Sequence, residues 1–223
     1  MSDYKLRRVL VVIVLLCIAA IPLASQPSDV VWLPFADSRN EQKVPASLAS
    51  LPVKGRAPKT GYSRSQFGDG WQTVNGCDTR NIILARDLTS DTVDEDCKVT
   101  SGVLHDPYTG KTIHFMRGDS TSDVQIDHVV ALSDAWQKGA QKLSYEKRIA
   151  MANDPLNLLA VDGPANQQKS DGDAATWLPP NKAFRCQYAQ RQIQVKQKYS
   201  LWITAAERDA MARVLGTCAN ADI

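Results

Sequence analysis

Five polar residues in the middle of this sequence are of types that transfer protons or bind cations: Asp127, His128, Asn157, Asn166 and Lys169. The first two are adjacent, the second asparagine follows the first by nine residues, and the lysine lies three residues further on. A free imidazole has a pKa near neutrality, so it can accept a proton from water at physiological pH. Carboxylate and amide oxygens are donors that hard cations prefer. These types together could transfer a proton through the histidine and bind a divalent cation through the oxygen donors.

The elements that must position these residues follow from the apolar pattern. In order, it predicts a strand at 123–132, short helices at 133–139 and 144–152, a strand at 156–161, and a helix that begins at Gly163. The Asp-His pair lies in the first strand and Asn166 in the last helix. Because strand side chains alternate, Asp127 and His128 point to opposite faces, and a twist at the strand end must bring both to one site. Strand, long loop, strand and helix is the arrangement of ββα-metal nucleases.

The remaining elements predict a mixed α+β domain with few strands. They are a helix at 78–88 with Asp78 as its N-cap, a hairpin at 101–116, a helix at 184–202, and a last helix that starts with the capping box at 204–207 and ends at Gly216. His105 and His114 lie on the expected hairpin, where we expect them to be surface or packing residues.

Several stretches of the sequence resemble a known enzyme family. QIDHVVALSDAW followed by NDPLNLLAVDGPANQQKSDGD resembles HNH endonucleases, and the steps of nine and three residues are similar to those in the HNH domain of RNA-guided nucleases. CDTRNIILARDL, LHDPYTGKTI and DAATWLPPNKAFRC are similar to a secreted bacterial HNH family related to the C-terminal nuclease module of GmrSD-type restriction enzymes. The resemblance covers residues 61–218. It implies a ββα-metal (HNH, or His-Me finger) core with added helices and a β-hairpin.

The resemblance also implies a role for each residue of the site. His128 is expected to be the general base that takes a proton from the attacking water, and Asn157 to hold the loop that carries it. Asp127 and Asn166 are expected to bind the metal, Mg²⁺ or Mn²⁺, because both supply hard oxygens. HNH enzymes commonly have His where this chain has Asn166, which weakens affinity for transition metals. The structural alternatives are a core histidine, an ion-paired aspartate and two turn or surface asparagines.

Basic residues after the site predict contacts with phosphate. Lys169 lies one helical turn beyond the second asparagine and is expected to contact a phosphate. The stretch 174–206 contains no acidic residue but has Lys182, Arg185 and Arg191. We interpret this stretch as a phosphate-binding helix. The alternative, a solvated helix whose aromatic residues face the core, has equal support from the sequence.

The N-terminal quarter predicts export. Three cations, Lys5, Arg7 and Arg8, precede an apolar run at 9–21 that is short for a membrane span. Residues 1–25 therefore predict a signal peptide, with an uncleaved membrane anchor as the alternative. Five prolines in 26–60 predict an extended linker, and the nuclease domain is expected at 61–219.

Four cysteines follow the apolar N-terminal run: Cys77, Cys97, Cys186 and Cys218. An even number in an exported chain predicts two disulfides. Of the three pairings that four cysteines allow, we favour Cys77–Cys97 and Cys186–Cys218, because each closes a local segment. A structural zinc site would need closely spaced pairs such as C-x-x-C, which the sequence does not contain.

Composition sets the outer limits on function. With 43% hydrophobic and 22% charged residues among 223, the chain is neither disordered, collagen-like nor a polytopic membrane protein. A net charge of +2 excludes a polycation, and three histidines nearly exclude a multi-histidine metal cluster. We therefore expect an endonuclease, secreted or anchored at the cell surface, that hydrolyses nucleic acid with low sequence specificity, DNA being favoured over RNA. The alternative is a catalytically inactive binding module of the cell envelope or of nucleic acid.

Overall fold

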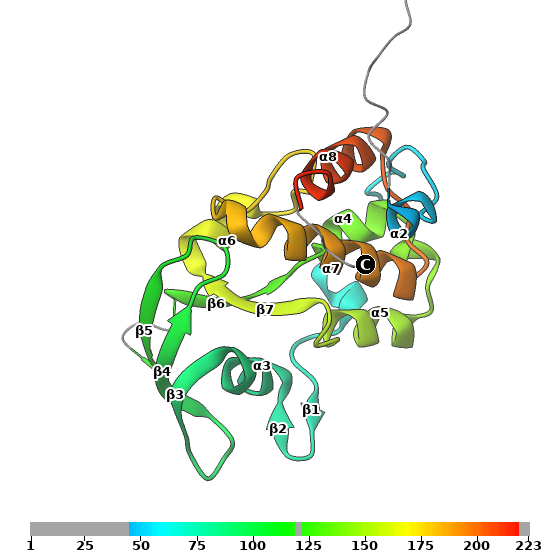
Figure 1. Ribbon diagram of the computed structural model, residues 1–223. Coiled ribbons are helices and arrows are strands. Elements are labelled where there is room, and N and C mark those ends of the chain that lie inside the picture. The colour runs from blue at the N-terminus through cyan, green and yellow to red at the C-terminus, as the bar shows by residue number, and fades with distance from the viewer. Residues whose placement is uncertain (1–44, 119–121, 219–223) are drawn as a thin grey trace, which may run out of the picture. The chain divides into compact units, whose positions relative to one another are not determined.

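In the computed structural model, two strands and the helix that follows them lie at the centre of the fold (Figure 1). β6 (Val124–His128) pairs antiparallel with β7 (Leu158–Asp162), in a register that places His128 opposite Leu158. α6 (Gly163–Lys169) begins directly after β7 and packs on both strands. Asp162 caps α6 by accepting a hydrogen bond from the Ala165 amide at 2.8 Å. The predicted order of strand, long connection, strand and helix is therefore present.

The structure describes residues 45–118 and 122–218. The export segment expected at 1–25 lies outside these residues, as does the first part of the expected linker. Among the helices that are described, none is long and apolar enough to cross a bilayer.

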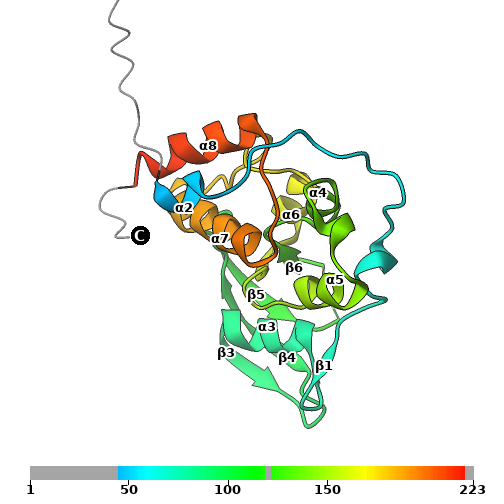
Figure 2. The same cartoon turned by 90° about the vertical axis from the view of Figure 1, so that its right-hand side faces the viewer.

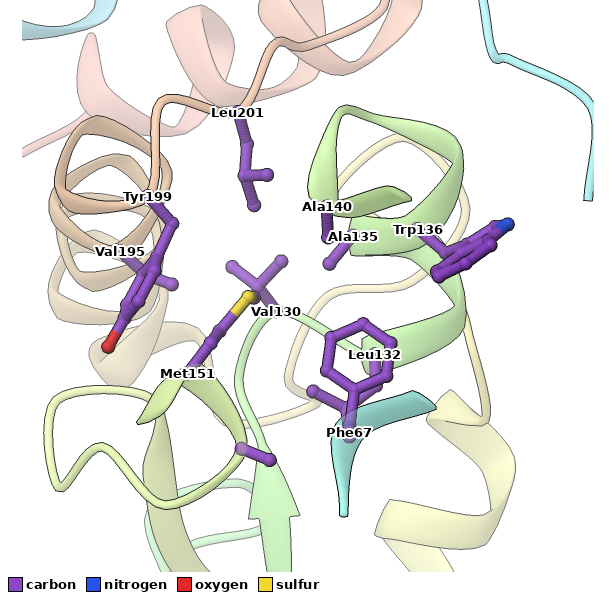
Figure 3. Close-up of a cluster of buried hydrophobic side chains, with 11 residues drawn as sticks. Phe67, Val130, Leu132, Ala135, Trp136, Ala140, Met151, Val195, Tyr199 and Leu201 are labelled. Atoms are coloured by element: carbon purple, nitrogen blue, oxygen red, sulfur yellow. The ribbon is translucent and has the colours of Figure 1, made fainter. Parts of the chain in front are cut away.

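The connection from β6 to β7 is helical and well anchored. It contains α4 (Leu132–Gln137), η2 (Ala140–Lys142) and α5 (Tyr145–Ala152), close to the bounds predicted from the sequence. Buried side chains from α4, α5 and α7 meet those of the loop after His128 and of η1 (Arg64–Phe67) in one apolar cluster (Figure 3). The loop that follows His128 is thus attached to a packed core, which limits the positions the histidine can adopt.

A second, three-stranded sheet lies beside the central strands, with the order β3–β4–β5 (Figure 1). β4 (Val99–His105) and β5 (Thr112–Met116) form the predicted hairpin, and β3 (Leu88–Val93) was not predicted. Its LTSDTV sequence buries only Leu88, so it lacks the alternation that marks a half-buried strand. α3 (Thr79–Asp87) precedes it, with Asp78 as the predicted N-cap, after a small hairpin of β1 (Thr73–Val74) and β2 (Cys77–Asp78).

The C-terminal helices cover the other side of the central strands. They are η3 (Lys182–Phe184), α7 (Arg185–Lys198) and α8 (Ala205–Leu215). α8 begins with the predicted capping box of Thr204 and Glu207. Figure 2 shows α2 (Ala46–Ala49) lying next to α8.

The structure differs from the linker expected at 26–60, because residues from 45 onward belong to the fold. Leu48 and Leu51 are buried against α8, and Val53 forms a parallel β-bridge with Ile203. Burial of two leucines fixes this segment on the helices, although the sequence around them shows no sustained apolar period. The folded region therefore begins before residue 61.

The two disulfides have the pairing that we favoured. Cys77–Cys97 joins β2 to the turn before β4, with Cα atoms 5.3 Å apart. Cys186–Cys218 joins the first turn of α7 to the residues after α8, with Cα atoms 5.9 Å apart. Each bridge closes a local segment, with sequence separations of 20 and 32 residues, as the spacing predicted.

A buried cluster of charged side chains holds the helices together. It consists of Arg56, Asp134, Lys138, Asp173, Lys196 and Glu207. Three positive charges meet three negative ones, and Arg56 is the one member that is partly exposed. Lys138 lies at the centre and contacts all three carboxylates at 2.6–2.8 Å.

Candidate active site

A cavity of about 450 Å³ lies where β6, the start of α4, α6 and η1 meet. Asp127, His128 and Asn166, three of the residues predicted to carry the chemistry, all line it. Along β6 the two side chains have different partners, since Asp127 contacts Tyr108 and Lys169 whereas His128 stacks on Trp71. That both groups act at one site stays a prediction.

One ring nitrogen of His128 is held and the other is left without a protein partner. Nε2 lies 2.9 Å from the carbonyl oxygen of Ala152. A carbonyl can only accept, so Nε2 carries the hydrogen and Nδ1 has the lone pair. Trp71 stacks on the ring, with centroids 5.7 Å apart and planes 8° apart. No other side chain or backbone group among residues 45–118 and 122–218 hydrogen bonds to Nδ1. The imidazole is therefore oriented with a free proton acceptor.

The electrostatic environment keeps this imidazole neutral. Burial, followed by the nearby positive charge of Arg64, lowers the pKa of His128 from 6.5 to about 4. Lys169 acts in the same direction, while the hydrogen bond to Ala152 and the charge of Asp127 oppose it. At pH 7 the ring is deprotonated, which is the form that a general base needs.

Asp127 is buried and already has two hydrogen-bond donors. Its Oδ1 accepts from the ammonium of Lys169 at 2.9 Å, and its Oδ2 accepts from the hydroxyl of Tyr108. The same ammonium donates to the carbonyl of His128 at 2.9 Å. Lys169 was expected to contact a phosphate. The structure differs, because the ammonium is buried and pairs with Asp127 inside the protein. Tyr108 lies within the hairpin predicted at 101–116 and was not among the predicted site residues.

Asn157 fastens the loop that carries His128. Its side chain is fully buried, with Oδ1 accepting from the Val130 amide at 2.8 Å and Nδ2 donating to the Val130 carbonyl at 3.3 Å. Its own carbonyl accepts from the Val129 amide at 2.8 Å. Both residues after His128 are thus bonded to Asn157. This geometry suits a positioning role and not direct contact with a substrate.

Asn166 offers the cavity a free amide oxygen. Its Nδ2 donates to Oε1 of Gln125 at 2.9 Å, and no described residue donates to its Oδ1. Each carboxylate oxygen of Asp127 also keeps a second lone pair. Within the described residues, no three His, Cys, Asp or Glu side chains converge on one point. Mg²⁺ often takes only one or two protein oxygens and fills its other positions with water and phosphate, so this donor set fits such an ion.

The basic residues predicted to bind phosphate differ in how many hydrogen bonds they make within the protein. Arg191 donates to the carbonyls of Pro155, Leu156 and Leu158 at 2.7–3.0 Å and so closes the turn before β7. The expectation that Arg191 binds phosphate therefore does not agree with its placement. Of the three residues predicted to bind phosphate, this leaves Lys182 in η3 and Arg185 in the first turn of α7.

Lys182 and Arg185 face a cavity, but not the one that His128 lines. Arg185 donates to the Pro179 carbonyl at 2.7 Å. Together with Arg213, the two residues line a second cavity of about 540 Å³ between the start of α7 and α8. Their predicted contact with nucleic acid stays a prediction.

Residues ahead of α3 contribute to the first cavity, although none of them was predicted from the sequence. Tyr62 and Arg64 line it, and Trp71 covers one face of His128. They belong to the stretch GYSRSQFGDGW, in which aromatic residues recur in a polar, glycine-containing context. Such spacing matches neither a helix nor a strand, so only the aromatic residues themselves could have drawn attention to it.

Comparison with known proteins shows the family to which the chain belongs. Residues 78–214, more than half of the chain, match the family described as GmrSD restriction endonucleases, C-terminal domain. A protein of Arthroderma benhamiae described as an uncharacterized secreted protein is 38% identical over 204 residues, covering 90% of this chain and 96% of that protein. No solved structure matches the chain significantly. The family match contains β6, β7 and α6, whereas η1 and Trp71 precede it.

Proposed function

Since this chain belongs to the family of GmrSD restriction endonuclease C-terminal domains, we propose that it is an exported HNH-type endonuclease with His128 as its general base. Family membership supports nuclease activity in general. The observation that supports His128 in particular is its geometry: the residue lines a cavity, one ring nitrogen is bonded to Ala152, and the other has no hydrogen-bond partner among the described residues. Packing of α6 against the antiparallel pair β6 and β7 supports a ββα-metal core.

The residues around the cavity have separate roles in the proposed hydrolysis. Nδ1 of His128 would take a proton from a water molecule as the water attacks phosphorus, while Ala152 and Trp71 hold the ring in place. A base with a pKa of about 4 is weak, but a bound phosphodiester changes its surroundings. The negative phosphate offsets the charge of Arg64 and raises the pKa of the imidazole towards the working pH. Substrate binding thereby strengthens the base.

We infer that Asp127 and Asn166 hold a divalent ion, with Mg²⁺ or Mn²⁺ as the best match to oxygen donors. Such an ion offsets negative charge on the phosphate and on the leaving 3′-oxygen when it is bound. Lys169 already compensates the charge of Asp127, so we expect weak affinity and an open, easily exchanged site. The expected products carry 5′-phosphate and 3′-hydroxyl ends.

Export and substrate class complete the proposal. Two disulfides form in oxidising compartments, and the relative in Arthroderma benhamiae carries the description secreted, which together support a secreted enzyme. DNA is proposed over RNA in line with the description of the matched family as restriction endonucleases. Low sequence specificity is proposed because a net charge of +2 suggests loose, salt-sensitive binding.

The deciding experiment is cleavage of plasmid DNA and of RNA by the full chain with Mg²⁺, with Mn²⁺ and with EDTA. We expect metal-dependent cleavage that His128→Ala lowers by about 10²-fold or more, the usual contribution of a general base. His114→Ala is the matched control, because His114 is exposed on β5 and does not line the cavity.

Two outcomes would contradict the proposal in different ways. An unchanged rate in His128→Ala would remove this residue from the mechanism. Absence of cleavage of either nucleic acid by the folded protein would favour the inactive binding module, for which a gel-shift assay would still detect a complex.

A further inference from the structure

Arg64 differs from most arginines that the structure describes, because its guanidinium donates no hydrogen bond to any described residue. Among the arginines of residues 45–118 and 122–218, only Arg64 and Arg213 donate no hydrogen bond to a protein group. The others bind backbone carbonyls or carboxylates. Arg64 lines the cavity of His128, and no other Lys or Arg among the described residues lines it.

The acidic side chains of the same cavity do not compensate this charge. Asp127 is paired with Lys169 at 2.9 Å. Asp171 is paired with Lys59 at 3.2 Å and accepts from the hydroxyl of Ser133 at 3.1 Å. Both carboxylates of this cavity are thus paired with lysines, and Asp69 is the acidic residue that shares a neighbouring hollow with Arg64. An anion that enters the cavity would meet the positive charge of Arg64.

The backbone that carries Arg64 is firmly placed. Phe67, at the end of η1, is fully buried beside Leu132 and Trp136 (Figure 3). Arg148 of α5 donates to the carbonyl of Gln66 at 2.8 Å and to its side-chain oxygen at 2.9 Å. A single anchored turn therefore directs Arg64 towards the cavity. Its charge is near enough to His128 to contribute to the lowered pKa of that residue.

We propose that Arg64 binds the scissile phosphate and stabilises the charge that develops on it during hydrolysis. The inference rests on the proposed nuclease function and adds a residue that lies ahead of the family match at 78–214. A guanidinium presents two parallel N–H donors to two phosphate oxygens, a geometry that lysine lacks. The phosphate would then lie between Arg64 and the water activated by His128, with the segment at 62–71 completing the active site.

The first test measures cleavage of a defined duplex oligonucleotide by the full chain and three variants. We expect Arg64→Ala to lower kcat about 10²-fold with a smaller change in KM, because a contact that strengthens in the transition state acts mainly on kcat. Arg64→Lys should recover part of the loss. Lys147→Ala is the control, since it removes an equal charge from exposed α5, which packs on η1 but does not line the cavity.

The second test measures binding without cleavage. A labelled oligonucleotide is titrated in EDTA at several salt concentrations, and the slope of log K against log salt should become shallower by about 1 in Arg64→Ala. An unchanged slope overturns the inference, and a raised KM with unchanged kcat overturns the assignment to the scissile phosphate. If the wild-type chain cleaves nothing, the proposed function fails, while the binding slope still decides whether Arg64 contacts phosphate.

Discussion

His128 shows how a few neighbours turn an ordinary residue into a prepared base. The carbonyl of Ala152 selects the tautomer, and Trp71 restricts rotation of the ring. Burial and the charge of Arg64 keep the ring deprotonated. None of these partners lies within 20 positions of His128 in the sequence. The local sequence around His128 therefore pointed only to the adjacent Asp127.

The lowered pKa predicts an unusual pH profile. The free enzyme binds a proton on His128 only below about pH 4, so kcat/KM should stay level from neutral pH down to about pH 5. The acid limb of kcat should lie at higher pH, because bound phosphate raises the pKa of the imidazole. Measuring both profiles tests this, and an acid limb of kcat/KM near 6.5 would contradict it.

The same shift affects stability in the opposite sense to a salt-bridged histidine. Between pH 6.5 and about 4 the unfolded chain binds a proton that the folded chain excludes, so the free energy of unfolding falls as the pH drops through this window. Above pH 6.5 both states have a neutral ring, and this contribution is fully present.

At the scale of elements, the basic residues of α7 serve assembly more than binding. Lys196 enters the buried charged cluster, Arg191 closes the turn before β7, and Lys198 pairs with Asp154 at 2.6 Å. The absence of acidic residues from this stretch of sequence reflects carboxylates supplied by other elements. A charge pattern along one helix cannot reveal such partners, because they come from segments far away in the chain.

The charged cluster predicts a large effect from one substitution. Lys138→Met keeps the length of the side chain but leaves three buried carboxylates with only Arg56 and Lys196 to balance them. Breaking a buried ion pair from one side costs about 3–5 kcal/mol in the free energy of unfolding. Urea unfolding should show this loss, whereas Lys147→Met on exposed α5 should match the wild type. A loss below 1 kcal/mol would mean that the cluster does not stabilise the fold.

At the scale of the whole molecule, residues 45–60 of the expected linker are part of the described fold. Leu48 and Leu51 add apolar surface to the core around α8, and Arg56 completes the charge balance of the buried cluster. Prolines in this stretch permit an extended path over the helices and do not prevent packing. The proline content therefore indicated the backbone conformation of 45–60 but not its burial.

Truncation separates the two interpretations of this segment. A chain that begins at residue 45 retains the whole of this segment and is the reference for the comparison. A chain that begins at residue 61 loses two buried leucines and Arg56, and we expect its free energy of unfolding to fall by about 3 kcal/mol or more. Equal midpoints for the two truncated chains would show that residues 45–60 act only as a spacer.

The sequence by itself determined those features that depend on a few neighbouring residues. The N-cap at Asp78, the capping box of α8, the hairpin of β4 and β5, and the local disulfides all follow from short-range geometry. Tertiary structure alone decided which charges are paired inside the protein: Lys169 is buried against Asp127, whereas Arg64 lines the cavity and has no hydrogen-bond partner among the described residues. The physical reason is that a charged side chain is buried only where a distant segment supplies its counter-charge, and no local pattern specifies that segment.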